Sequence, residues 1–293
     1  MRNPSRHSAV IAAVASVLLF STGGLSIKLL PLAALPIAGL RGLIAAVFIG
    51  LLLIKQGRGK TLCRMSRYGW MGAASYVLMT TTYVMAMKMT TAANAIFLQY
   101  TMPAWVMAGG ALWLGEKITF GRVVTIGLSL LGMAFFFMGE LRPGEWRGNG
   151  LALFSGLTFA GVILALRRDR ERGPLDSVFW GNAANAVFVI PLAALYQPGF
   201  WAQLSSPAVW AGLLWLGVFQ IGVGYILYII ALKGLLAVEV AILSLIEPVL
   251  NPTWVYLANG ETPSIQALIG GAVILTAVLL YSLYSQPEIE PSS

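Results

Sequence analysis

The sequence predicts an all-α polytopic membrane protein, with ten transmembrane helices arranged as two inverted five-helix repeats around a central cavity. Hydrophobic residues make up 58% of its 293 residues and charged residues only 10%, against about 25% charged in soluble domains. Apolar runs of about 20 residues, the length that crosses a bilayer, recur along the whole chain. Residues of the first half also reappear 145 positions later.

Charged residues, glycines and prolines separate the apolar runs and fix their ends. The expected spans are 9–29, 34–54, 68–88, 92–113, 120–140, 148–166, 177–196, 208–231, 235–257 and 264–285. The first run follows Arg2 and Arg6 like a signal peptide, but it is longer than a signal core, so we expect it to persist as a helix. The repeats are expected at 1–142 and 143–285, followed by a disordered acidic tail at 286–293.

The two halves match at residues that are scarce in membrane spans. The matching pairs are Tyr83 and Tyr228, Lys88 and Lys233, Pro103 and Pro248, Gly115-Glu116 and Gly260-Glu261, and Thr119 and Ser264. Each Gly-Glu pair is expected to end a helix, and the following Thr or Ser to cap the next one. We expect each Glu to lie favourably near the N-terminus of that following helix. Because each half has an odd number of spans, the second half inserts upside down, which is the arrangement of alternating-access transporters.

The basic residues indicate the orientation. Most of the 19 Lys and Arg residues fall in segments that are cytoplasmic if the N-terminus is inside, as the positive-inside rule requires. The rule places both termini in the cytoplasm. It also makes the basic stretches Lys55–Arg67 and Arg167–Arg172 topology signals rather than nucleic-acid sites.

The chain has little chemistry for an enzyme. Cys63 is the only cysteine and His7 the only histidine, which rules out an intrachain disulfide and a His/Cys metal or haem site. There are no paired intramembrane aspartates and no phosphate-binding loop of the Gly-x4-Gly-Lys-Ser/Thr kind. We expect no catalysis, no cofactor and no metal.

Two prolines inside apolar runs predict helix breaks at matching depth. Pro103 frees the carbonyl of Gln99 and Pro248 frees that of Ser244. A substrate ammonium, a water or a neighbouring helix can partner such a carbonyl. Polar and aromatic residues of the spans complete the predicted cavity: Ser21, Thr22, Tyr76, Thr80, Tyr83, Gln99, Tyr100, Pro103, Thr158, Gln220, Tyr225, Tyr228, Ser244 and Pro248.

Glu247 and Arg41 are the charges expected deepest in the spans. A carboxylate there costs about 2.5–3.5 kcal/mol on insertion scales. Three roles remain open for Glu247: a structural ion pair with Arg41, a protonatable coupling site, or direct binding of a substrate amine.

Two runs of the chain resemble the EamA-type branch of the drug/metabolite transporter superfamily. They are Ala92–Pro103 with Leu114-Gly115-Glu116, and Val240–Pro248 with Asn259-Gly260-Glu261; Leu40-Arg41-Gly42 is similar to that family's second span. The resemblance implies ten helices, export of small metabolites and a cavity bounded by spans 1, 3, 4, 6, 8 and 9. Phe20-Ser21 stands where the family often has Trp-Ser.

These patterns favour a transporter over an intramembrane enzyme or a scaffold, because neither needs mirrored helix breaks. We expect it to export small amphipathic metabolites, amino acids above all, from the bacterial inner membrane; the alternative is proton-coupled export of hydrophobic drugs or organic amines. Expected partners are the small-molecule substrate and membrane lipid, with no nucleic acid. Glycines such as Gly132 and Gly270 permit close helix packing within a monomer or a homodimer.

Overall fold

The structure is a computed structural model that describes residues 4–58, 65–136, 138, 145–171, 173–197, 199–259 and 264–284. All regular elements among these residues are helices, and no strand occurs there. The predictions made for Cys63, Gly260, Glu261 and the tail 286–293 fall outside the described residues.

The helices follow the predicted runs closely. The first part of the chain forms α1 (Arg6–Leu29), α2 (Ala34–Lys55), α3 (Arg67–Met89), α4 (Ala92–Gln99), α5 (Met102–Gly109), the π-helix η1 (Gly110–Leu114) and α6 (Phe120–Phe136). The second part begins with α7 (Trp146–Arg168), α8 (Leu175–Ala184), the π-helix η2 (Asn185–Val189), α9 (Ile190–Tyr196) and the short α10 (Phe200–Gln203). It continues with α11 (Pro207–Leu214), the π-helix η3 (Trp215–Val223), α12 (Gly224–Gly234), α13 (Ala237–Ser244), α14 (Glu247–Asn259) and α15 (Ile265–Tyr284).

Six helical stretches of the described chain are long and apolar enough to cross a membrane. They are Arg6–Leu29, Ala34–Lys55, Trp146–Arg168, Leu175–Tyr196, Pro207–Gly234 and Ile265–Tyr284. The other predicted spans fall short for local reasons: α3 is rich in polar residues, α6 has 17 residues, and two spans are broken. The protein is therefore an all-helical, multi-pass membrane protein.

The two broken spans are broken at corresponding residues. In the first, α4 ends at Gln99 and α5 begins at Met102; in the second, α13 ends at Ser244 and α14 begins at Glu247. The two bounds in the second span lie 145 residues after those in the first. The start of α13 likewise lies 145 residues after the start of α4. Both breaks come within one turn before the predicted proline, whose ring excludes a continuous helix there.

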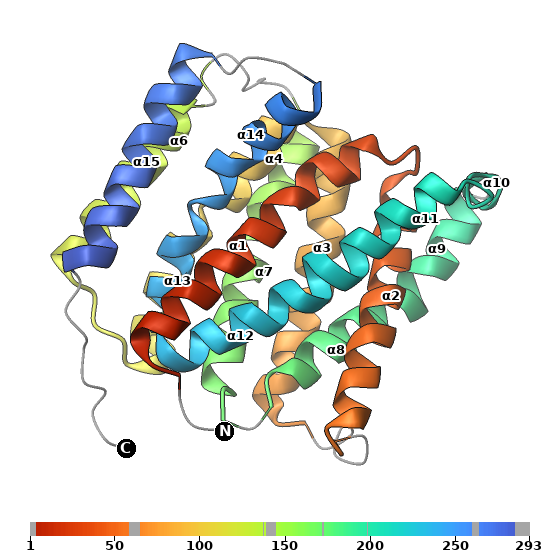
Figure 1. Ribbon diagram of the computed structural model, residues 1–293, viewed down its shortest axis with the longest axis horizontal. Coiled ribbons are helices and arrows are strands. Elements are labelled where there is room, and N and C mark those ends of the chain that lie inside the picture. The colour runs from red at the N-terminus through yellow and green to blue at the C-terminus, as the bar shows by residue number, and fades with distance from the viewer. Residues whose placement is uncertain are drawn as a thin grey trace.

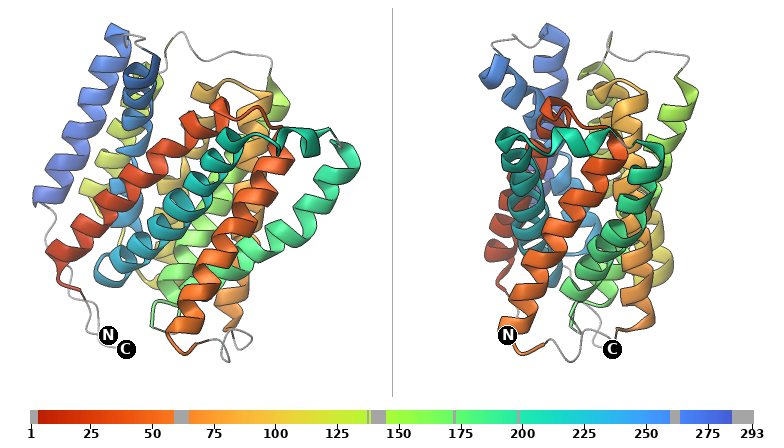
Figure 2. Two further views of the ribbon diagram at one scale, coloured as in Figure 1. Left: turned by 45° about the vertical axis from the view of Figure 1, so that its right-hand side comes forward. Right: turned by 90° about the vertical axis from the view of Figure 1, so that its right-hand side faces the viewer.

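Segments far apart in the chain pack side by side. In Figure 1, α1 runs beside α12 and η3, while α3 packs against α7 behind them. α2 lies against α8, η2 and η3. Figure 2 shows that the start of α1 and the end of α15 lie toward the same end of the molecule.

α6 and α15 form a pair at one side of the molecule (Figure 1). A Cβ built on Gly270 would lie 2.5 Å from the carbonyl oxygen of Gly132 and 2.6 Å from the amide nitrogen of Phe136. This contact confirms the predicted close packing at these glycines. Gly121 and Gly127, by contrast, have open space around them and serve no such contact.

The predicted helix end at Gly115 and the predicted helix caps at Thr119 and Ser264 are confirmed. Gly115, with φ of 72°, ends η1. The hydroxyl of Thr119 accepts from the amide of Arg122 at 3.4 Å, and that of Ser264 from the amide of Ala267 at 3.1 Å. These caps set where α6 and α15 begin.

Candidate functional site

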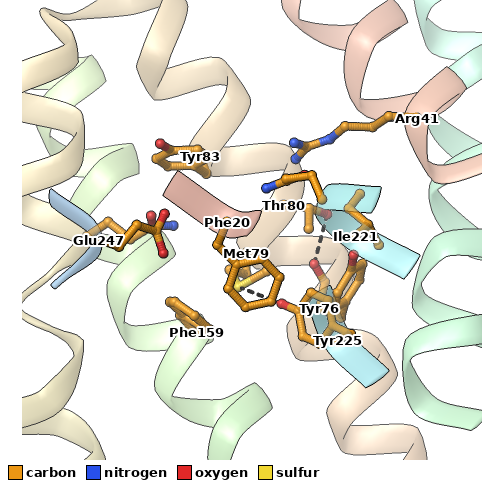
Figure 3. Close-up of a pocket in the computed structure, with 12 residues that line it drawn as sticks. Phe20, Arg41, Tyr76, Met79, Thr80, Tyr83, Phe159, Ile221, Tyr225 and Glu247 are labelled. Carbon is orange, nitrogen blue, oxygen red and sulfur yellow. Dashed lines mark hydrogen bonds between the residues drawn. The ribbon is translucent and has the colours of Figure 1, made fainter. Parts of the chain in front are cut away.

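A cavity of about 60 Å³ lies at the centre of the helices (Figure 3). Its walls come from α1, α2, α3, α4, α7, η3, α12 and α14, so both parts of the chain contribute. The lining residues are Phe20, Arg41, Tyr76, Met79, Thr80, Tyr83, Gln99, Phe159, Gln220, Ile221, Tyr225 and Glu247. An apolar pocket with a few convergent polar groups is the usual form of a small-molecule site.

A second cavity, of about 430 Å³, lies between α6 and α15. Apolar residues dominate it, and its one charged residue, Arg122, is held by the hydroxyl of Tyr281 and the carbonyl of Lys117. Although it is larger, this cavity lacks converging charges, so the central cavity is the better candidate.

Arg41 brings a positive charge into the central cavity from α2. The side chain is only 3% exposed, and its Nε has no hydrogen-bond partner among the described residues. The groups that act on it electrostatically are the phenols of Tyr76, Tyr83 and Tyr225. A buried polar group without a partner costs about 1–3 kcal/mol, and more when charged, so this arginine is poorly explained by stability alone.

Glu247 supplies the opposite charge from the other part of the chain. It is the first residue of α14, where the helix dipole favours a carboxylate. The phenols of Tyr83, Tyr100 and Tyr228 lie close enough to interact with it electrostatically. The helix break thus explains how a carboxylate is tolerated at this depth.

Arg41 and Glu247 face the cavity from different sides in Figure 3. None of the ion pairs between described residues joins them; these pairs are Arg6–Glu239, Arg58–Asp176, Arg167–Glu116 and Arg170–Glu171. The structural ion pair with Arg41, one of the three roles left open for Glu247, is therefore not formed in this conformation. The two charges are instead left facing the cavity.

Two asparagines behind α3 hold its polar face in place. The hydroxyl of Tyr76 donates to Oδ1 of Asn182 at 3.2 Å. Nδ2 of Asn185 donates to Oγ1 of Thr80 at 2.7 Å, and Oδ1 of Asn185 accepts from Thr81 at 3.1 Å. Asn185 opens η2, and such π-helical turns often occur at functional sites. Neither asparagine was predicted to belong to the site. A polar amide inside the apolar span 177–196 could have indicated both.

Aromatic rings form the apolar wall of the cavity. The ring of Phe20 lies 5.1 Å from that of Tyr225 and 5.7 Å from that of Tyr228. The rings of Tyr76 and Tyr225 are 5.2 Å apart at an interplanar angle of 65°. Tilted contacts at these distances are favourable. Tyrosines predicted for the cavity from two distant spans therefore meet at one place.

The carbonyl freed at the first break is covered by α7. A Cβ built on Gly156 would lie 2.6 Å from the carbonyl oxygen of Gln99, so only glycine allows this approach. The side-chain amide of Gln99 donates to Ser155 at 2.6 Å, and Ser155 donates to the carbonyl of Met79 at 3.2 Å. A neighbouring helix, rather than a substrate, thus approaches this carbonyl in the structure.

The structure brings six of the fourteen predicted cavity residues, together with Arg41 and Glu247, into the cavity wall. The six are Tyr76, Thr80, Tyr83, Gln99, Gln220 and Tyr225. Tyr228 does not line the cavity, but its ring makes a tilted contact with the lining residue Phe20. Tyr100 is buried near Glu247, and Pro103, Ser244 and Pro248 are buried beside the breaks. None of these four lines the cavity.

Ser21, Thr22 and Thr158 are held elsewhere. Ser21 accepts from Nε1 of Trp254 at 2.8 Å and Thr22 from Nε1 of Trp215 at 3.0 Å. Thr158 donates to carbonyls of its own helix. Their hydroxyls are therefore committed to contacts within a helix or between helices, away from the cavity. The lining residues that prediction missed are Phe20, Met79, Phe159 and Ile221.

A further polar cluster joins the two parts of the chain outside the cavity. Glu116 accepts from the amides of Ala237 at 2.9 Å and Val238 at 3.4 Å, at the start of α13, and lies 3.7 Å from Arg167. Burial raises the pKa of the Glu116 carboxyl, against the opposing effects of the Ala237 amide and Arg167. The sequence placed Glu116 near the N-terminus of the following helix of its own half and did not predict that its carboxylate caps α13, in the second part of the chain.

Comparison with known proteins identifies the family. A model of the EamA-like transporter family matches residues 7–138 and again 146–283. A solved crystal structure shares the fold, with a TM-score of 0.83 at 20% identity over 95% of this chain and 98% of that one.

Curated relatives agree with this. An uncharacterized transporter of Archaeoglobus fulgidus is 28% identical over 225 residues, 75% of this chain and 76% of the relative. The pseudopaline exporter CntI of Pseudomonas aeruginosa is 27% identical over 80% of this chain and 78% of its own. A probable terminal-alkyne amino-acid exporter of Streptantibioticus cattleyicolor is 26% identical over 89% and 84%. The chain belongs to the EamA-like transporter family and is a membrane transporter, not an enzyme.

Proposed function

We propose that the protein exports small amphipathic metabolites, amino acids first among them, by alternating access through the central cavity. The observation that carries this is the meeting of two matching broken helices at one cavity with an aromatic wall and two opposite charges. Broken helices at a central site are characteristic of secondary transporters.

The architecture behind this proposal is ten transmembrane segments in two inverted five-helix repeats, 1–142 and 143–285. The shared offset of the broken helices supports it, as does the double match of the family to the chain. We further propose that the protein lies in the bacterial inner membrane with both termini in the cytoplasm, as the positions of its basic residues indicate.

Two observations support amino acids as the substrates. Two relatives are named as exporters, one of pseudopaline and one, as probable, of a terminal-alkyne amino acid. The cavity, at about 60 Å³, is also far below the roughly 300–1,000 Å³ of sites that hold drug-sized ligands. A small substrate needs less rearrangement of the walls than a large one.

Glu247 favours the second candidate, proton-coupled export of organic amines or hydrophobic drugs, because a carboxylate in a cavity attracts an ammonium group. Arg41 in the same wall opposes it, since a bare cation would meet a buried guanidinium in the same cavity. The balance of these two charges makes amino acids the first candidate.

Counterflow in proteoliposomes tests the transport proposal. Vesicles loaded with unlabelled amino acids should accumulate the labelled amino acid, and Thr80→Val, which removes a cavity hydroxyl bonded to Asn185, should slow this. Thr82→Val, the same change on the same helix outside the cavity, is the matched control. If a broad panel of amino acids shows no flux while amines exchange, the second candidate replaces the first.

Cysteine labelling tests the inverted topology. Cys63→Ser removes the only native thiol, after which Lys88→Cys and Lys233→Cys place one thiol at equivalent ends of the two halves. An impermeant maleimide added to intact cells should label the first and leave the second unlabelled until the cells are opened. Labelling of both from outside would show that the halves point the same way.

A further inference from the structure

The two charges of the central cavity are an unusual pair, because both are inside the helix assembly and neither neutralises the other. Arg41 is 3% exposed with an unpartnered Nε, and no ion pair joins it to Glu247 among the described residues. Tyrosine phenols, and not the opposite charge, are the groups that act on each of them. A ligand that carries both charges can satisfy both residues where a direct contact does not.

The placement of the charges fixes how such a ligand would lie. Figure 3 shows the guanidinium of Arg41 reaching in from α2 and the carboxylate of Glu247 from α14, with the aromatic residues in the same space. Oε1 of Gln220, also in the wall, is a buried acceptor without a partner among the described residues. The guanidinium of Arg41 therefore offers donors to an anion, and the oxygens of Glu247 and Gln220 offer acceptors to an ammonium group.

The remaining wall is apolar. Phe20, Met79 and Phe159 supply side chains without charge, and the rings of Tyr76 and Tyr225 complete this surface. The apolar surface suits a ligand with an uncharged aliphatic or aromatic side chain. A third charge on the ligand would be buried there without a partner, at a cost of several kcal/mol.

We propose that the site selects zwitterions: Arg41 binds the carboxylate of an α-amino acid, Glu247 its ammonium group, and the aromatic wall an apolar side chain. This assignment rests on the proposed export of amino acids and narrows it to neutral, apolar ones. It also gives Glu247 a role in binding substrate rather than in a fixed ion pair.

Three ligands that share one ring test the proposal on the unaltered protein. L-Phenylalanine carries both charges, phenethylamine lacks the carboxylate, and 3-phenylpropanoate lacks the ammonium group. Inhibition of labelled L-phenylalanine counterflow should be at least tenfold weaker for either single-charge analogue, since a charged hydrogen bond contributes about that factor or more. Because this arm uses no variant, misfolding cannot affect it.

Two variants assign each charge to its residue. Glu247→Gln should weaken L-phenylalanine about tenfold but not weaken 3-phenylpropanoate, because that analogue makes no use of the carboxylate and is repelled by it. Arg41→Gln should weaken L-phenylalanine but not phenethylamine, which the guanidinium repels, and Arg41→Lys should recover part of the loss.

The outcomes separate the two proposals. Equal inhibition by all three ligands, or stronger inhibition by phenethylamine than by L-phenylalanine, overturns zwitterion selection while leaving export intact. Unchanged L-phenylalanine affinity in both neutral variants does the same. Absence of counterflow for both L-phenylalanine and L-leucine overturns the export of apolar amino acids and this inference with it.

Discussion

Gly156 offers a direct test of how the first helix break is held. Its position on α7 is so close to α4 that an added Cβ would lie 2.6 Å from the carbonyl oxygen of Gln99 and 3.1 Å from that of Leu98. Both atoms belong to the backbone, so a side-chain rotation cannot relieve the clash. Overpacking of this kind costs about 1–3 kcal/mol, partly offset by the roughly 1 kcal/mol by which alanine favours a helix over glycine.

We therefore expect Gly156→Ala to lower the free energy of unfolding by up to about 2 kcal/mol, and the Tm by up to about 8 °C. The assay is thermal unfolding of the purified protein in detergent. Counterflow should fall as well, because the shift acts on the segment that carries Gln99 into the cavity wall.

Gly150→Ala is the matched control, since Gly150 lies on the same helix and a Cβ added there would have nothing within 4 Å. It should leave the Tm unchanged or raise it slightly. If Gly156→Ala proves as stable and as active as Gly150→Ala, the close approach of α7 to the break is not a constraint and the account of the freed carbonyl is wrong.

Three further predictions concern the contacts around the cavity. Glu116→Ala leaves Arg167 buried and two α13 amides uncapped, so stability should fall by about 3–5 kcal/mol; Glu116→Gln keeps an acceptor and should lose less, as thermal unfolding would show. Asn185→Ala removes the partner of Thr80 and should cost about 1–3 kcal/mol and raise the KM for transport. Ser21→Ala removes the acceptor of a Trp254 bond outside the cavity, so the Tm should fall slightly with the KM unchanged.

Each of these has an outcome that contradicts it. Equal losses in the two Glu116 variants would mean that the charge alone, and not the capping of α13, joins the halves. An unchanged KM in Asn185→Ala would show that the orientation of Thr80 does not matter to the substrate. A raised KM in Ser21→Ala would return that serine to the binding site.

The features that local sequence could predict are those set by the chain's own neighbours. Pro103 and Pro248 located both helix breaks to within a turn, because the ring of proline acts on the residues just before it. Tyr76, Thr80 and Tyr83 share one helix face by spacing alone, and all three line the cavity.

What the sequence could not predict depends on contacts between distant segments. Glu116 caps a helix that begins 121 residues later, at Ala237, and no local pattern encodes that partner. Ser21 and Thr22 have the composition of cavity residues, but tryptophans of distant helices take their hydroxyls. The π-helices likewise have no spacing rule, although η3 carries Gln220 and Ile221 into the wall.

The α6–α15 pair has a consequence for the surrounding lipid. The described part of α6 rises about 26 Å over 17 residues at 1.5 Å per residue, and the 20 described residues of α15 rise about 30 Å. A typical hydrocarbon core is about 30 Å thick. Leu131 and Leu279 are well exposed on this pair, so its outer surface suits acyl chains. Because α15 alone rises the full thickness of an ordinary core, a much thinner bilayer would strain this edge, at a fraction of a kcal/mol per Å of mismatch.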